Sequence, residues 1–247
     1  MVVEGFGFIE ALYFSIVTIA TVGYGDVHPV TQAGRLLAIF LIALGVGTFL
    51  GVVANATEIM LARREHESRL KNLNMVIGVF FSEVGTSLLA ALSEQDPGLE
   101  RIRGDLVVKG TWKDDDFSEV SNRLRSYVYD LTVGTTDLSE MKSFLGEKRD
   151  FLLRLLENPS LLEHEKFTDL LRAVFHLAEE LESREDITGL PDADRQHLGG
   201  DMKRVYGLLM HQWLDYMHYL KTSYPYLFSL AVRKNPFDPA ASPIVRG

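Results

Sequence analysis

The residues with the clearest chemical potential are a short motif, T-V-G-Y-G-D, at positions 21–26. A monovalent cation leaves water readily only where other oxygens replace its hydration shell, and backbone carbonyls can supply them. Gly23 and Gly25 permit the positive φ angles that turn successive carbonyls toward one side of the chain. The Thr21 hydroxyl adds another oxygen. These properties are compatible with an oxygen-lined cation site along residues 21–25, with the Val22 and Tyr24 side chains packed behind the carbonyls.

Apolar segments lie on both sides of the motif. Residues 11–20 have the length of a short helix, and a longer apolar run begins at Leu36. This order of short helix, TVGYGD motif and long helix resembles the pore of two-transmembrane-helix prokaryotic potassium channels across roughly residues 5–66. The resemblance implies a K⁺ selectivity filter at 21–25, and a homotetramer in the cell inner (plasma) membrane, because one chain supplies a quarter of the ring.

The resemblance also assigns residues around the filter. Residues 6–20 become a pore helix that enters the membrane without crossing it, which is tolerated only where protein buries the backbone. Tyr13 is implied to hydrogen-bond to Asp26 behind the filter, and plain packing of an interfacial aromatic is the alternative. Two-helix channels place an outer transmembrane helix before the pore helix. We therefore expect that the sequence begins late or is a fragment, with a one-span subunit as the alternative.

The segment from Gln32 to about Ala62 is predicted to be the inner transmembrane helix. Leu36 to Ala54 is a run of 19 residues without a charge, and at about 1.5 Å per residue it spans ~28 Å, close to a bilayer core. Arg63 and Arg64 follow, which places the C-terminal side in the cytoplasm.

Glycines are frequent inside this helix, and one has an implied role. The family resemblance makes Gly45 a gating hinge, whereas close helix packing through small residues is the other interpretation. Spacing of three and four residues predicts one pore-lining face, formed by Val46, Phe49, Val53 and Thr57.

Composition excludes several function classes. The chain has no cysteine, so disulfides and thiol chemistry are absent. Residues 1–62 carry four acidic residues against Arg35, and the remaining residues carry 30 acidic and 24 basic residues. This acidic balance argues against nucleic-acid binding. No pattern indicates catalysis, so we predict that the protein is not an enzyme and that it needs no cofactor beyond the transported K⁺.

The second part of the chain is predicted to be a soluble helical bundle. Residues 63–74 are expected to continue the inner helix as a linker, and residues 75–235 to form a cytoplasmic helical domain. The apolar segment from Met75 to about Leu92 is assigned to the core, because Glu83 near its middle would be costly in a membrane. Further helices are predicted at 98–109, 116–131, 137–156, 160–183, 192–222 and 224–233, with a break at Gly199-Gly200 and a disordered tail at 236–247. The overall class is all-α: a pore module followed by a helical bundle.

Histidines and acids recur at helical spacing in this second part. Helical bundles can bind metals through such pairs, although solvated or capping side chains on amphipathic helices are the favoured interpretation. The candidates are Asp215 with His218 and His211, Asp194 with His197, and His176 with Glu179 and Glu180.

The sequence thus predicts a potassium-selective channel subunit that conducts passively and is gated by its helical domain. Its predicted partners are three further copies and the lipid bilayer, and the domain's ligand is unknown. The alternative is a helical binding module attached to a truncated, non-conducting pore remnant.

Overall fold

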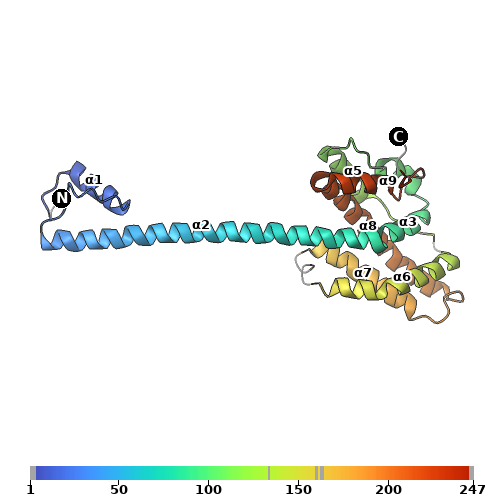
Figure 1. Cartoon of the computed structure of the whole chain (residues 1–247). Coiled ribbons are helices and arrows are strands. Elements are labelled where there is room, and N and C mark those ends of the chain that lie inside the picture. The colour runs from blue at the N-terminus through green and yellow to red at the C-terminus, as the bar shows by residue number, and fades with distance from the viewer. Residues whose placement is uncertain (1–3, 133, 159–160, 162–163, 245–247) are drawn as a thin grey trace. The chain divides into compact units, whose positions relative to one another are not determined.

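The computed structural model describes residues 4–132, 134–158, 161 and 164–244, without the side chains of 66–71 and 135–137. Every regular element in this part of the chain is a helix, as the all-α prediction requires. The chain divides into a pore unit, Met1–Ser68, and a helical unit, Arg69–Gly247. Figure 1 shows both units and labels most of their helices. The division falls inside the segment predicted to be a linker.

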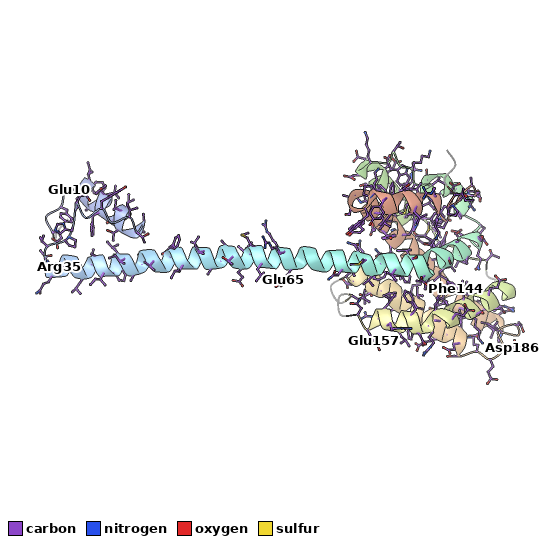
Figure 2. All side chains as sticks on the ribbon, viewed as in Figure 1. Glu10, Arg35, Glu65, Phe144, Glu157 and Asp186 are labelled. Carbon is purple, nitrogen blue, oxygen red and sulfur yellow. The ribbon has the colours of Figure 1, made fainter. Side chains whose placement is uncertain are left out.

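The pore unit contains α1 (Phe8–Ile19), the TVGYGD loop and the first part of α2 (Gln32–Phe80). The amide of Gly34 donates to the Thr31 hydroxyl across 3.0 Å, so Thr31 caps α2. In Figure 2, Glu10 marks α1 and Arg35 the start of α2. Only small residues are buried among residues 4–65, namely Gly34, Ala38 and Gly45. Residues 4–65 therefore contain no core of large side chains within one chain.

Helix α2 is much longer than a membrane span. It runs over 49 residues, so the predicted linker 63–74 does continue the inner helix. Two helical stretches in the described chain are long and apolar enough to cross a membrane, Gln32–Glu65 and Asn72–Glu94. They differ in burial. In an apolar 18-residue window of each stretch, 6% is buried in the first and 44% in the second. The first fits a lipid-facing span, and the second fits a core helix.

The second stretch contains a change of helical geometry. Helix α2 passes into a π-helical turn, η1 (Phe81–Gly85), and then into α3 (Thr86–Glu94). A Cβ at Gly85 would lie 2.6 Å from the Phe81 ring, so glycine lets that ring fold back. Ile77 and Phe80 of this stretch are fully buried. The assignment of this segment to the core rather than to a second membrane span is confirmed.

The remaining helices follow the predicted order with shifted limits. The segment predicted as one helix at 98–109 is split into a 3₁₀ turn and a four-residue helix. Gly199 and Gly200 do not interrupt α8, so the predicted break there is wrong; burial of the residues on both sides favours helix over the conformational freedom of glycine. The elements are η2 (Leu99–Arg101), α4 (Arg103–Leu106), α5 (Asp114–Ser126), α6 (Thr135–Leu156), α7 (Glu165–Glu182), α8 (Asp192–Ser223) and α9 (Pro225–Arg233).

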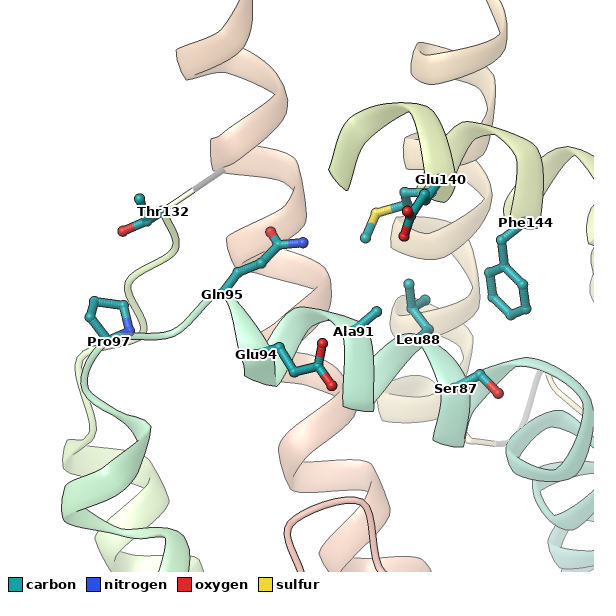
Figure 3. Close-up of a pocket in the computed structure, with 10 residues that line it drawn as sticks. Ser87, Leu88, Ala91, Glu94, Gln95, Pro97, Thr132, Glu140 and Phe144 are labelled. Atoms are coloured by element: carbon teal, nitrogen blue, oxygen red, sulfur yellow. The ribbon is translucent and has the colours of Figure 1, made fainter. Parts of the chain in front are cut away.

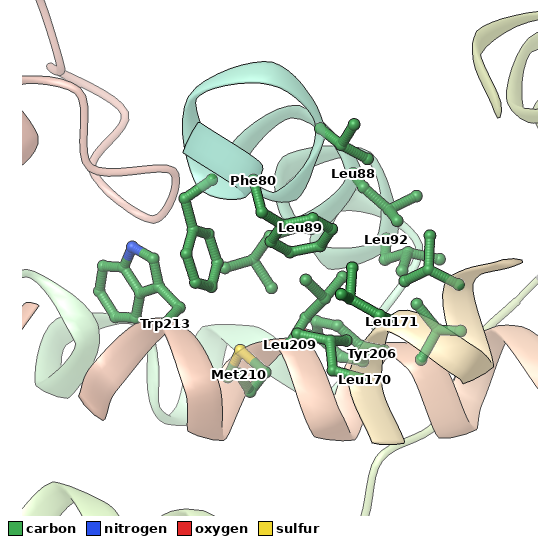
Figure 4. Close-up of a cluster of buried hydrophobic side chains, with 14 of the residues drawn as sticks. Phe80, Leu88, Leu89, Leu92, Leu170, Leu171, Tyr206, Leu209, Met210 and Trp213 are labelled. Atoms are coloured by element: carbon green, nitrogen blue, oxygen red, sulfur yellow. The ribbon is translucent and has the colours of Figure 1, made fainter. Parts of the chain in front are cut away.

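The core of the helical unit forms where α2 and α3 meet α7 and α8 (Figure 4). Phe80 and Phe167 pack edge to face with ring centroids 5.4 Å apart. The ring of Phe81 stacks on Tyr216 at 5.2 Å. Aromatic pairs of these kinds add to the stabilisation from area burial alone. The end of α2 is therefore an integral part of this core.

The residues after α9 are more ordered than predicted. Phe237 is fully buried and its ring lies 4.9 Å from that of Trp213. The Asn235 amide donates to the Leu106 carbonyl across 2.9 Å, which fixes the turn that delivers Phe237. The prediction of a disordered tail from 236 is therefore wrong at Phe237. The prediction was based on a segment composition rich in proline and alanine. It therefore overlooked a single aromatic residue, Phe237, that packs in the core.

Candidate ion-conduction site

The TVGYGD loop has the backbone that the motif predicts. Both glycines adopt positive φ, 56° at Gly23 and 77° at Gly25, and Thr21 also does so at 57°. No heavy atom lies within 4 Å of a Cβ added at either glycine, so conformation rather than space selects glycine there. A non-glycine residue with positive φ is uncommon and marks strain at a functional site. The loop therefore has a backbone conformation that residues other than glycine rarely adopt.

Helix α1 fixes the start of this loop by main-chain hydrogen bonds. The amides of Val22 and Gly23 both donate to the Val17 carbonyl, at 3.0 and 3.3 Å. The amide of Thr21 donates to the Thr18 carbonyl at 3.1 Å. These bonds use carbonyls that a helix C-terminus otherwise leaves without partners. The loop is thus an extension of the last turn of α1.

The far end of the loop is tied back to α1 by a side chain. The Tyr13 hydroxyl donates to Asp26 Oδ2 across 2.7 Å. This is the hydrogen bond that the family resemblance implied, and it is confirmed. A hydrogen bond to a carboxylate is stronger than one between neutral groups. Tyr13 and Asp26 together bracket the five residues of the predicted filter.

Glu4 makes a connection that the sequence analysis missed. Its carboxylate accepts hydrogen bonds from the amides of Val30 and Thr31, at 2.9 and 3.0 Å, and from the Thr31 hydroxyl. A carboxylate is favourable at a helix N-terminus because it meets free amides and the positive end of the helix dipole. Glu4 therefore joins the segment before α1 to the start of α2. Sequence periodicity does not relate Glu4 to Val30 and Thr31, which are 26 and 27 residues away. This contact is visible only in the structure.

Gly45 lies where α2 passes the end of α1. It is buried, and a Cβ at this position would lie 2.8 Å from the Ile19 carbonyl oxygen. Such a contact with backbone cannot be relieved by moving a flexible side chain. This observation supports the close-packing interpretation of Gly45, and the hinge stays a prediction. Gly47 differs, because no heavy atom lies within 4 Å of an added Cβ.

The predicted pore-lining residues all lie on α2. Val46, Phe49 and Val53 are exposed in the single chain at 39%, 64% and 45%. The Thr57 hydroxyl donates to the Val53 carbonyl within the helix at 2.8 Å. The lining role stays a prediction, because an ion pathway would form between chains.

The histidines and acids of the helical unit separate into different environments. His218 lies 2.9 Å from Asp114 and stacks on Phe117, while Asp215 lies 3.9 Å from Lys166. His211 instead faces Tyr129, so the three residues predicted to share a face have different partners.

The other two predicted groups do meet. His176 and His197 both lie near Glu180, and a residue that the sequence analysis missed, Asp201, lies between them. Asp194 binds Arg184 instead of joining His197. In the conformation seen, no group of three or more such side chains in the described chain is positioned to hold a metal ion.

The helical unit also contains a cavity of about 580 Å³ (Figure 3). Leu88, Ala91 and Phe144 form apolar parts of its wall, and Glu94 and Glu140 supply carboxylates. The side-chain oxygen of Gln95, which also lines it, is buried and accepts no hydrogen bond from the described residues. A second groove of about 500 Å³ is mostly aromatic and aliphatic and lies between the end of α2, α8 and α9.

Comparison with known proteins decides the family of the chain. The C-terminal helical domain described for the uncharacterized protein MJ1433 matches residues 69–233. The uncharacterized protein MJ1433 of Methanocaldococcus jannaschii is 47% identical over 187 residues, covering 76% of this chain and 75% of the relative. The chain belongs to the MJ1433 family. No solved structure matches the chain.

The pore unit matches a second description. An ion channel domain matches residues 1–62. Two further relatives come from the same archaeon: probable potassium channel protein 2, 37% identical over 73 residues, and potassium channel protein 1, 38% identical over 82 residues. The matches cover 29% and 30% of this chain but only 21% and 25% of those proteins. The chain is therefore a membrane protein with an ion-channel domain fused to a helical domain, and its matches indicate a channel rather than an enzyme.

Proposed function

We propose that this protein is a subunit of a potassium-selective, homotetrameric channel. The observation that supports it most directly is the TVGYGD loop with positive φ at Gly23 and Gly25, tied to α1 at Val17 and Tyr13. Four such loops supply the carbonyl oxygens that replace the water of K⁺. The relatives named as potassium channels support the choice of ion. The ion moves down its gradient, and no bond is made or broken.

The tetramer follows from two features of the pore unit. One loop provides a quarter of the filter, so selective binding needs four copies around one axis. The large apolar side chains of α1 and α2 are exposed in the single chain, for example Phe8 at 67% and Phe40 at 67%. Such surface requires lipid or further copies to cover it. In this proposal, lipid and the other three subunits together cover this apolar surface.

The helical unit is proposed to gate the pore from the cytoplasm through α2. This helix passes without interruption from the membrane segment into the core of the helical unit, where Phe80 is fully buried. A change in packing around Phe80 therefore acts on the same helix that carries Gly45. A ligand of the helical unit would shift the open and closed populations only by its difference in affinity for them.

Reconstitution of the full-length protein in liposomes tests the conduction proposal. A K⁺ gradient should drive a K⁺ flux that far exceeds the Na⁺ flux under the same gradient. Equal K⁺ and Na⁺ fluxes would contradict the filter assignment, and native mass spectrometry that finds only monomers or dimers would contradict the tetramer.

Gating through α2 needs a different variant. A glycine-serine segment inserted after Asn74 should leave selectivity unchanged while it uncouples the helical unit, measured as single-channel open probability. The matched control is the same segment inserted after Pro243, an exposed residue beyond the buried Phe237 and outside the connecting helix. Equal open probability in the parent and the Asn74 insertion variant, with any regulator of the parent still effective, would contradict coupling through α2.

A further inference from the structure

Two histidines and two carboxylates meet between neighbouring helices of the helical unit. His176 and Glu180 are one turn apart on α7, and His197 and Asp201 are one turn apart on α8. Residues four apart share a helix face, and α7 and α8 pack against each other (Figure 1). Each helix thus presents one imidazole and one carboxylate to the same place. None of these four residues contributes to the pore.

Each of the two histidines lies close to both carboxylates. His176 Nε2 lies 3.8 Å from Glu180 Oε1 and 3.7 Å from Asp201 Oδ2. His197 Nε2 lies 3.6 Å from Glu180 Oε2 and 3.5 Å from Asp201 Oδ2. Each histidine nitrogen therefore faces both carboxylates, rather than forming one pair with one acid.

These distances distinguish between two kinds of contact. A hydrogen bond between an imidazole and a carboxylate has nitrogen and oxygen about 2.7–3.2 Å apart, so all four contacts are too long. Adjacent ligands of a tetrahedral zinc ion with metal–ligand bonds of about 2.0–2.1 Å lie roughly 3.3 Å apart. The observed separations exceed that spacing by a few tenths of an ångström. Glu180 presents Oε1 to His176 and Oε2 to His197, so binding of one shared ion requires side-chain rotation from the conformation seen.

Asp201 gives independent support for a missing cation. Its side chain is 10% exposed, and Oδ2 is buried and accepts no hydrogen bond from the described residues. A buried carboxylate oxygen without a partner is costly. This oxygen is the atom that lies 3.5 and 3.7 Å from the two histidine nitrogens. An ion between them would give it the partner it lacks.

The surrounding charges suit a divalent ion. Arg184 donates to Glu180 Oε2 at 2.8 Å and forms two hydrogen bonds with Asp194, at 2.6 and 2.7 Å. The arginine therefore orients Glu180 from outside, as partners of metal ligands usually do. Three carboxylates and one guanidinium leave two negative charges when the histidines are neutral. A dication would balance them.

We propose that His176, Glu180, His197 and Asp201 form a binding site for a divalent transition-metal ion. Two imidazole nitrogens and two carboxylate oxygens are ligands that Zn²⁺ accepts in tetrahedral sites. Hard ions such as Mg²⁺ and Ca²⁺ prefer oxygen ligands alone, so the histidines select against them. The site would give the helical unit a ligand that joins α7 to α8, independent of what the pore conducts.

Metal titration of the full-length protein in detergent tests this site. The protein is first stripped with a chelator, then titrated with Zn²⁺ in a calorimeter and with Co²⁺ in a spectrometer. We expect one ion per chain and the visible absorption of a four- or five-coordinate Co²⁺. Zn²⁺ should also raise the unfolding midpoint of the helical unit, because the ion binds the folded state. Absence of both binding and midpoint shift would overturn the proposal.

Variants identify the ligands. His176→Gln and His197→Gln should each weaken Zn²⁺ binding at least tenfold, and the double variant should lose the Co²⁺ absorption. The matched control is His218→Gln, which removes another histidine of the unit that faces an acid, Asp114. It should bind as the parent does. Both ligand histidines are about half exposed, so the variants should unfold as the metal-free parent does. Parent-like binding in the double variant would overturn the assignment.

Discussion

The pore unit and the helical unit use the same secondary structure for opposite purposes. In the pore unit, side chains are exposed on one chain, and the proposed function depends on the backbone of a short loop. In the helical unit, large side chains such as Phe80, Phe167 and Tyr206 are fully buried. Of all the buried hydrophobic residues in the described chain, only Ala38 precedes Leu73. The large side chains of the pore unit are thus uncovered in a single chain, whereas the helical unit has a core of its own.

The two units therefore depend on different features of the amino-acid sequence. The pore unit depends on identities at a few positions, because positive φ selects glycine and close passage of helices selects small residues. The helical unit depends on volume and pattern, which many sequences can satisfy. A motif therefore reveals the pore unit, whereas only burial reveals how the helical unit is built.

The largest effect is expected from a substitution in the proposed filter. Gly25→Ala should abolish K⁺ current, because residue 25 has φ of 77° and a Cβ opposes that backbone. Liposome flux and single-channel recording measure the loss. Gly7→Ala is the matched control, since Gly7 has φ of −61° and an added Cβ would lie 3.6 Å from the Glu10 side chain. A selective K⁺ current in Gly25→Ala would show that the glycine backbone is not required.

The core of the helical unit comes next. Phe80→Ala should lower the free energy of unfolding by about 3–5 kcal/mol, the range for large aromatic residues removed from a core. Val79→Ala is the control, because Val79 is 48% exposed and should change stability by about 0.5 kcal/mol or less. Both tryptophans, Trp112 and Trp213, lie in the helical unit, so their fluorescence in urea reports on this unit in the whole chain. Equal losses would contradict a core built around the end of α2.

A smaller effect distinguishes the two interpretations of Gly45. Close packing predicts that Gly45→Ala reduces the tetramer fraction several-fold, because the added Cβ meets the Ile19 carbonyl at 2.8 Å. A hinge predicts normal assembly with a lower open probability and unchanged selectivity. Gly47→Ala has no such contact and should assemble as the parent does. Native mass spectrometry and single-channel recording together separate these results.

Sequence reasoning predicted the pore unit in more detail than the helical unit. The motif and the Tyr13–Asp26 hydrogen bond are local or follow from a known pattern, and each is present. The Glu4 contact with Val30 and Thr31 joins positions that no periodicity relates.

The helical unit shows the same limit. Periodicity predicted that α7 and α8 exist, but it could not bring His176 next to His197, because their meeting depends on how two helices pack. Asp201 was missed since an acid at helical spacing is ordinarily solvated, and its burial is a property of the fold. Phe237 was missed because the composition of a segment is an average, whereas a single residue of that segment can be buried in the core.

The smallest expected effect is a pH dependence within the helical unit. Burial lowers the pKa of His211, more than nearby Asp215 raises it, with Arg125 and Lys166 contributing in the same direction as burial. The folded chain therefore binds fewer protons at His211 than the unfolded chain, whose histidine has a pKa of about 6.5. The free energy of unfolding should decrease as the pH falls below that value, and the loss should end below the folded pKa.

His211→Gln should reduce this pH dependence of the free energy of unfolding in chelator-treated protein, measured by tryptophan fluorescence in urea at several pH values. His218→Gln is the matched control for loss of a histidine from the same helix. An unchanged slope in His211→Gln would show that His211 is not held neutral by the fold.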